Sequence, residues 1–408
     1  MKRNYFIVGL VLLIFFVISF LTNIIGPLVP DIIETFNLSL TTVALLPFAF
    51  FIAYGLMSIP SGMLIERFGE KRVMVAAFFS AFFGAFLFSW MPAYGTYLVS
   101  LFFIGTGMAM LQVAINPLLR VAGGEEHFAF NSVMGQLVFG LASFLSPLVY
   151  SYVTLNLERE SAGMLSDPTS GTTSGSMSWI ALYWIFAAVS LLMVIVVGAV
   201  RLPKVELKEE EKAGPLRTHL DLLKQSKVIL YFLAVFAYVG TEQGVANWIS
   251  QFLETYHGID PQTTGAKTVS LFWGLMTAGA VLGLILLKFM DSRKVLILFT
   301  LAAIVSLSIA LFGPANAALI AFPAVGFFAS VMWSIIISLA LNSVESHHGS
   351  LSGILVTGIA GGAVVSLIVG GLGDLLGLRV GMLFLYLTLG YILSVGLWAK
   401  PLINNKTV

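Results

Sequence analysis

The segment GMLIERFGEKR, residues 62–72, joins two long apolar runs of the chain through a short charged turn. A later glycine is followed by similar residues at the same offsets of five, six and ten. The pairs are Gly62 with Gly283, Arg67 with Lys288, Phe68 with Phe289, and Arg72 with Arg293. This weak repeat supports a division of the chain into two parallel halves. One large class of transporters uses that arrangement to hold a ligand near the bilayer midplane, between two rocking bundles.

The composition indicates a membrane protein. Of the 408 residues, 58% are hydrophobic and only 10% are charged, whereas roughly a quarter of the residues of a soluble domain are charged. Such a chain cannot cover a water-exposed surface, which excludes soluble enzymes and nucleic-acid-binding proteins. The sequence has no cysteine, so disulfides and thiolate metal sites are excluded as well.

Apolar runs cut by short polar connectors predict an all-α membrane protein with twelve spans. The first run follows Lys2 and Arg3, but it is too long for the apolar part of a signal peptide and has no small-residue cleavage site, so we expect a helix. The predicted spans are 5–26, 41–61, 73–91, 97–119, 128–154, 179–200, 228–256, 265–287, 295–312, 315–342, 350–373 and 380–399.

The positions of lysine and arginine test this segmentation independently. If the N-terminus is cytoplasmic, eighteen of the 21 basic residues lie inside and only Arg159, Lys267 and Arg379 lie outside. That asymmetry is a strong positive-inside signature and predicts that both termini are cytoplasmic. We expect an N-terminal bundle over 1–200, a cytoplasmic linker over 201–227 and a C-terminal bundle over 228–408. Short termini and compact loops suit a bacterial inner membrane, and we expect a monomer.

Several segments resemble a known family. Residues 62–72 are similar to the loop between the second and third helices of the major facilitator superfamily, with Glu66 in place of the usual aspartate. Four further segments look like the fucose permease branch, which includes bacterial glucose/galactose transporters: 48–62, 111–117, 238–242 and 358–363. The resemblance implies symport of a hexose or related sugar with a cation, by alternating access, with no cofactor other than the coupling ion.

The chain departs from the proton-coupled fucose permeases at two positions. Those proteins carry an aspartate late in the first helix and a glutamate in the fourth, where this chain has Gly26 and Gln112. The glucose/galactose group is similar to this chain at both points and has an acid in the seventh helix. We therefore expect Na⁺ rather than H⁺ as the coupling cation.

Glu242 is the acid that we place deepest in a predicted span. It lies about fifteen residues after the span begins, or ~22 Å along a ~30 Å hydrocarbon core. A carboxylate there costs on the order of 2.5–3.5 kcal/mol and usually faces a cavity or a partner. Because no basic residue is predicted at that depth, a proton, a bound cation or a substrate hydroxyl would have to stabilise it. The alternative is a purely structural hydrogen bond to a neighbouring helix.

Polar and aromatic side chains at membrane depth are candidates for sugar binding. Gln112 and Asn116 lie four residues apart and share one helix face. Amides supply the donors and acceptors that sugar hydroxyls need, although such groups also serve as interhelical hydrogen bonds. Asn247 shares a face with Glu242 only if the helix unwinds at Gly240 or Gly244. The remaining candidates are Asn23, Gln136, Gln243, Trp273 and Trp333.

Two further predictions concern gating and alternative functions. By family likeness Glu66, Arg67 and Arg72 belong to a charge network that stabilises one conformation; the alternative is simple anchoring at the membrane surface. No metal site is expected, because the adjacent pair His347 and His348 has poor ligand spacing. The chain lacks a phosphate-binding loop and a nucleophile–histidine arrangement, so it is not expected to be an enzyme. A proton-coupled exporter of drugs or metabolites and a non-transporting sugar receptor stay open.

Overall fold

The computed structural model describes the chain except for residues 1–3, 125–127, 165–177, 204–215, 345–347 and 402–408. Twelve helical segments are long and apolar enough to cross a membrane, and the described residues contain no strand. The predicted fold class and number of spans are therefore confirmed. Helices are the expected form, because a backbone in lipid must satisfy its own hydrogen bonds.

The N-terminal half contains seven α-helices and a short 3₁₀ turn at Ser178–Ile180. The helices are α1 Tyr5–Thr22, α2 Ile25–Phe36, α3 Leu40–Phe68, α4 Glu70–Trp90, α5 Tyr94–Gly123, α6 Phe128–Met164 and α7 Ala181–Ala199. Gly69 alone connects α3 to α4, with φ +80°, a conformation that glycine adopts at no steric cost.

The C-terminal half has more and shorter helices. They are α8 Leu216–Leu223, α9 Ser226–Ala246, α10 Ile249–His257, α11 Ala266–Phe289, α12 Ser292–Phe312, α13 Ala315–Ala329, α14 Met332–Leu341, α15 His348–Thr357, α16 Gly361–Leu376, α17 Leu378–Met382 and α18 Leu385–Trp398. A π-helical turn, Pro261–Gly265, precedes α11, and a 3₁₀ turn, Gly358–Ala360, precedes α16.

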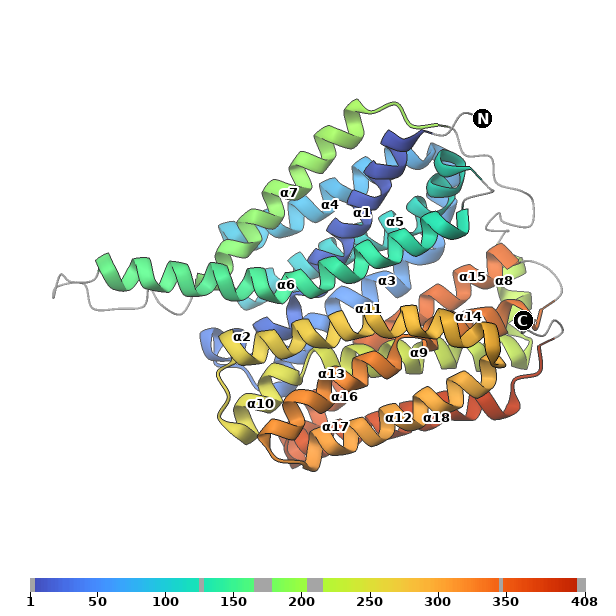
Figure 1. Ribbon diagram of the computed structural model, residues 1–408. Helices are drawn as coiled ribbons and strands as arrows, with labels where there is room; N and C mark the ends of the chain where they lie inside the picture. Colours follow the sequence, from blue (N-terminus) through green and yellow to red (C-terminus); the bar gives the residue numbers. More distant parts are fainter. Residues whose placement is uncertain (1–3, 125–127, 165–177, 204–215, 345–347, 402–408) are drawn as a thin grey trace.

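A constant offset relates the two halves. The spans that begin at Ser226, Pro261 and Ala315 each start 221 residues after those that begin at Tyr5, Leu40 and Tyr94. The pairs noted between residues 62–72 and the second half have the same separation. Figure 1 shows α1 and α4 to α7 in the upper part of the view and α12, α17 and α18 in the lower part. The bundle boundaries at 200 and 228 stay predictions.

The two bundles meet along a few helices. The α3 helix packs along α16, α6 along α11, and α2 against α10. Glycines allow close approach at these contacts: a Cβ added at Gly370 would lie 2.6 Å from the carbonyl oxygen of Leu40, and one at Gly140 would collide with Thr277.

Several spans are interrupted where the sequence analysis expected continuous helices. The first span breaks at Asn23 and Ile24 and then continues to Phe36, ten residues past the predicted end at 26. Pro27 falls in the first turn of α2, where its missing N–H is tolerated, so it does not end the span. The seventh span breaks at Asn247 and Trp248, and the tenth at Ser330 and Val331.

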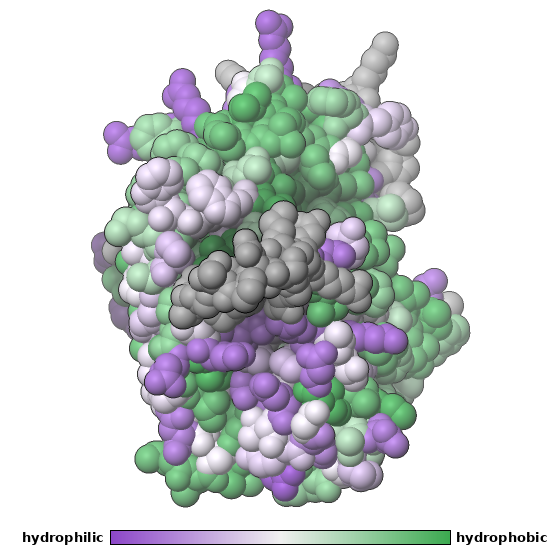
Figure 2. Space-filling model, turned by 90° about the vertical axis from the view of Figure 1, so that its left-hand side faces the viewer, coloured by the Kyte–Doolittle hydropathy of each residue, from purple (hydrophilic) through white to green (hydrophobic). Residues whose placement is uncertain are grey.

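The two ends of the molecule differ in charge. We call the end that carries Arg67, Arg72 and Arg293 the basic face. The opposite end, the acidic face, carries among others Asp31, Glu34, Glu254, Asp260 and Asp374, together with Lys267 and Arg379. Figure 2 looks onto the acidic face, where hydrophilic side chains gather across the middle and lower part of the view.

Candidate transport site

Glu242 sits on α9, one turn before that helix ends at Ala246, and its side chain is half-buried. The hydroxyl of Tyr238 donates to Oε2 of Glu242, and the side-chain amide of Gln243 donates to Oε1 at 3.1 Å. The ring of Tyr238 lies 6.1 Å from that of Trp333 on α14. The structure therefore brings together three predicted residues, Glu242, Gln243 and Trp333, around a tyrosine that the sequence analysis missed.

The contact of Tyr238 with Glu242 could have been predicted from the spacing of the two residues in the sequence. It precedes Glu242 by four residues, so a regular helix places both side chains on one face. A buried tyrosine generally needs a partner for its hydroxyl, and the acid one turn away supplies it.

Gln112, on α5 of the other bundle, is half-buried and accepts a hydrogen bond from the Tyr54 hydroxyl at 3.4 Å. Tyr54 belongs to α3 and also lies within hydrogen-bonding reach of Thr22 on α1. Gln112 and Trp333 are separated by 221 residues, so they occupy equivalent positions in the two bundles. The side chain of Asn116 lies outside the described part of the chain.

A chain of contacts connects these two groups across the bundle interface. A Cβ added at Gly362 of α16 would lie 3.1 Å from Cγ of Gln243 and 3.2 Å from Cγ of Phe51 on α3. The rings of Phe51 and Tyr54 are 6.2 Å apart. The polar groups of the two bundles are thus linked through one glycine and two aromatic rings.

Asn23 and Trp273 are buried with unused hydrogen-bonding atoms. Asn23, at the break between α1 and α2, donates to Ser143 Oγ at 2.8 Å. Its Oδ1 has no partner among the described residues, and neither does the indole nitrogen of Trp273 on α11. Burying an unpaired polar group costs about 1–3 kcal/mol. A ligand hydroxyl could pair with either atom, which keeps both residues as candidates.

Asn247 and Gln136 are placed less favourably for binding. Asn247 is buried and donates to Ser366 of α16 at 3.4 Å. Gly26 packs directly on this segment, because a Cβ added there would lie 2.5 Å from the carbonyl oxygen of Ala246. The helix does break at Asn247, rather than at the two glycines considered from the sequence. Gln136 is exposed on α6, one turn before Gly140, which contacts α11.

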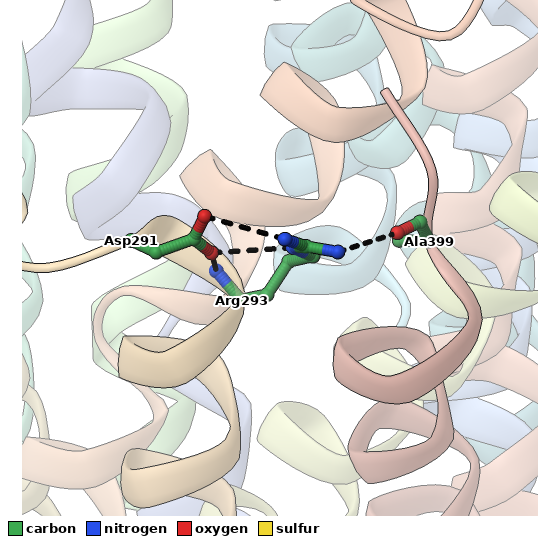
Figure 3. A network of polar contacts seen from close by, with 3 residues as sticks. All are labelled: Asp291, Arg293 and Ala399. Atoms are coloured by element: carbon green, nitrogen blue, oxygen red, sulfur yellow. Dashed lines mark hydrogen bonds and ion pairs between the residues drawn. The ribbon is translucent and has the colours of Figure 1, made fainter. Parts of the chain in front are cut away.

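The predicted gating residues Glu66, Arg67 and Arg72 are all exposed on the basic face, where the guanidinium of Arg67 lies 5.1 Å from the ring centroid of Phe68. In the other bundle, Arg293 forms an ion pair with Asp291 at 3.2 Å and donates to the carbonyl of Ala399 at 3.3 Å (Figure 3). The gating role stays a prediction. His347 lies outside the described residues.

Two acids hold the bundles together at the acidic face, and the sequence analysis assigned neither of them. Asp374 of α16 accepts hydrogen bonds at 2.8 Å from the backbone amides of Leu40 and Thr41, which begin α3 in the other bundle. Asp31 of α2 accepts from Tyr150 at 2.7 Å and from Gln262, in the other bundle, at 3.4 Å. Asp31 escaped notice because the predicted first span ended before it.

Comparison with known proteins places the chain in a family. A family model described as the Major Facilitator Superfamily matches residues 11–367. A glucose/galactose transporter of Brucella abortus is 30% identical over 404 residues, which are 97% of this chain and 95% of that protein. An L-fucose-proton symporter of Escherichia coli is 26% identical over 395 residues, or 92% of this chain and 89% of that protein.

The fold agrees with this placement. A crystal structure of the Escherichia coli fucose:proton symporter matches with a TM-score of 0.70 at 22% identity, covering 98% of this chain and 100% of that chain. The matched relatives are transport proteins, so this chain is a transport protein rather than an enzyme. With twelve spans in two equivalent halves and a family match over most of its length, the chain belongs to the Major Facilitator Superfamily.

Proposed function

We propose that this protein takes up a hexose or related sugar together with a cation, by alternating access. The relatives named as sugar transporters support the substrate class. The observation that carries the mechanism is Glu242, a half-buried acid of the seventh span, one turn before α9 breaks, whose two oxygens both accept hydrogen bonds. A carboxylate in that position has to be neutralised by a bound cation or a proton while the site is closed to water on both sides.

Na⁺ is the coupling ion that we favour. The relative named as a proton symporter supports the alternative, H⁺. Against H⁺, the two positions at which the proton-coupled fucose permeases carry acids hold Gly26 and Gln112 here, and Gly26 is packed so closely on Ala246 that no side chain fits. An ionised carboxylate and neutral oxygens are ligands suited to a hard cation.

The sugar site would lie between the bundles. Gln112 offers an amide from one bundle, Glu242 and the Trp333 ring come from the other, and both Gln112 and Glu242 are half-buried rather than closed off. Asn23 and Trp273 each keep one unpaired polar atom. Together these groups supply donors, acceptors and an aromatic face, which is the chemistry that a ring of hydroxyls on an apolar skeleton requires.

The orientation follows from charge. With the basic face cytoplasmic, as the positive-inside rule requires, the acidic face points outward, in a bacterial inner membrane and with both termini inside. The hydrogen bonds of Asp374 and Asp31 then hold the outer side of the bundle interface together in this conformation. Sugar and cation would enter after these contacts part, and they would leave toward the basic face.

The test is uptake of labelled glucose, galactose, fucose, mannose and fructose into proteoliposomes, under an imposed Na⁺ or pH gradient. We expect one gradient to drive accumulation in the wild type and not in Glu242→Gln. Glu254→Gln, which makes the same change at an exposed acid of α10, is the matched control and should accumulate sugar normally. No uptake of any hexose under either gradient would refute the proposal and favour the exporter.

A further inference from the structure

We infer that Tyr238 and Gln243 are positioning residues: they hold Glu242 as an ionised carboxylate, and Gln243 ties that arrangement to the contact between the bundles. This inference rests on the proposed role of Glu242 in coupling. Tyr238 lies outside the set of candidates that the sequence supplied. Gln243, a predicted sugar-binding residue, donates from its side-chain amide to the acid.

The two hydrogen-bond partners of Glu242 suit an ionised acid. An ionised carboxylate is an acceptor on both oxygens, whereas a protonated one must donate from one of them. Here Oε2 of Glu242 receives the Tyr238 hydroxyl and Oε1 receives the amide of Gln243 at 3.1 Å. Each oxygen of Glu242 thus faces a group that can donate to it, and this arrangement stabilises the ionised form; a proton on Oε2 would require the Tyr238 hydroxyl to turn and accept.

The side chains that donate to Glu242 are buried, whereas Glu242 itself is partly exposed. Tyr238 and Gln243 are each only 4% exposed, whereas Glu242 between them is half-buried. The ring of Tyr238 is fixed by its contact with Trp333 at 6.1 Å. The two donors therefore orient the carboxylate from the protein side and leave its remaining lone pairs for a cation or a sugar hydroxyl.

Gln243 also touches the seam between the bundles. Its Cγ and the ring of Phe51, which comes from the other bundle, both border Gly362, where an added Cβ would lie 3.1 and 3.2 Å from them. Gly362 is the second residue of α16, which follows the 3₁₀ turn Gly358–Ala360 directly. Movement of α3 along α16 must therefore change the space available to Gln243, and with it one of the two donors to Glu242.

No other titratable group competes with Tyr238 for Glu242 in the part of the chain that the structure describes. Tyr391 of α18 donates to the backbone of Leu230 at 3.0 Å, and Asp374 of α16 is engaged with the start of α3. His219 of α8 lies near Gly353 of α15, toward the basic face. The proton affinity of Glu242 should therefore respond to the loss of the Tyr238 hydroxyl, with no second acid or base to mask the change.

The direct test is Tyr238→Phe, which removes the hydroxyl and keeps the ring against Trp333. In this variant the ionised form of Glu242 loses a hydrogen bond that stabilised it. Protons should therefore bind Glu242 more readily, and the pH midpoint of its titration should rise by about one unit or more. Under Na⁺ coupling this moves acid inhibition of uptake to higher pH. Under H⁺ coupling it moves activation of uptake in the same direction. Tyr391→Phe, which removes a phenol hydroxyl elsewhere in the bundle, should leave the profile unchanged.

A measurement that does not need transport separates this inference from the proposed function. The infrared band of the protonated Glu242 carboxyl, assigned by its loss in Glu242→Gln, can be titrated in the purified protein. An upward shift in Tyr238→Phe supports the inference even if no sugar is accumulated. An unchanged midpoint in a folded Tyr238→Phe protein overturns it. If that variant does not fold, Gln243→Met removes the other donor and should shift the midpoint in the same direction.

The link to the bundle contact has its own test. Gly362→Ala places a methyl group against both Gln243 and Phe51, so we expect the midpoint of the Glu242 band to move and uptake to slow several-fold. Gly371→Ala, on the same helix, meets only Thr41 Oγ1 at 3.9 Å and should behave as the wild type. Equal behaviour of the two alanine variants would refute the link while leaving the Tyr238 result intact.

Discussion

The two bundles share a backbone plan and differ in chemistry. Residues 221 apart occupy equivalent positions, yet Gln112 corresponds to Trp333, and Glu242 corresponds to Leu21. The N-terminal bundle thus offers a neutral amide where the C-terminal bundle offers an aromatic ring, and only the C-terminal bundle places an acid at this depth of the seventh or first span. Under the proposed function, the sugar hydroxyls would be bound by both bundles and the cation by the C-terminal bundle alone.

Removing the acid should have the largest effect. Glu242→Gln keeps the shape of the side chain and its capacity to accept from Tyr238, but it removes the charge that a cation would neutralise. We expect gradient-driven accumulation to fall at least tenfold, while exchange of labelled for unlabelled sugar across the membrane continues. The comparison is made between the gradient assay and counterflow in the same vesicles. Loss of both activities would show that the acid serves binding or folding rather than coupling.

Changing the neutral amide Gln112 of the other bundle should affect sugar binding without affecting the cation. Gln112→Leu removes both polar atoms, and one hydrogen bond to a neutral partner contributes about 1 kcal/mol. We expect the sugar KM to rise about fivefold with the cation dependence unchanged. Initial rates of uptake at varied sugar and varied cation measure the two separately. A changed cation dependence with an unchanged sugar KM would assign Gln112 to the ion site and remove the division of labour.

A third experiment tests the contact that holds the bundles together at the acidic face. Asp374→Asn weakens a cap on the start of α3, a loss of about 1 kcal/mol, and should raise the population separated at this face about fivefold. The sequence has no cysteine, so spin labels can be placed directly at Gly95→Cys and Asn316→Cys, two exposed positions that are 221 residues apart.

The control for this experiment is Asp260→Asn. Asp260 caps its own helical turn, accepting from the amide of Gln262 at 3.0 Å, and does so within one bundle. We expect pulsed electron–electron double resonance to report longer distances between the two spin labels for Asp374→Asn only. Equal distance distributions in both variants would mean that the Asp374 contact has no part in closing this face.

The smallest effect is expected on the basic face. The pKa of Asp291 lies below its usual range. Partial burial raises this pKa, but hydrogen bonds from Arg293, the charge of Arg293 and the backbone amide of Lys294 lower it by more. A lowered pKa stabilises the fold at neutral pH and is lost as the pH falls through that of the folded state. Asp291→Asn should reduce stability by about 0.5 kcal/mol at pH 7 and have no effect near pH 2.

Thermal unfolding at the two pH values checks this last prediction. Glu70, the residue equivalent to Asp291, and Arg72, equivalent to Arg293, form no ion pair in the described ranges. Glu70→Gln should therefore change stability less than Asp291→Asn does at pH 7. A larger loss for Glu70→Gln would show that the charge contacts of the two bundles are more alike than the structure indicates.

The sequence by itself determined the fold class and the membrane spans, and it supplied Glu242 as the main candidate for the coupling residue. Apolar runs, the placement of lysine and arginine, and the repeat of residues 62–72 are local or periodic signals, and they predicted twelve helices in two halves. The fixed rise of a helix predicted that Glu242 lies deep in the seventh span. Local signals failed at Pro27 and Asp31, where the first span continues beyond residues that resemble a connector.

Only the tertiary structure decided which side chains meet. Phe51 and Gln243 are far apart in sequence and both border Gly362, and Asp374 reaches the start of a helix in the other bundle. Sequence periodicity gives the face of a helix on which a residue lies, but not the helix that faces it. Contacts between helices depend on how closely their backbones approach, and here glycines at Gly26, Gly362 and Gly370 set that distance.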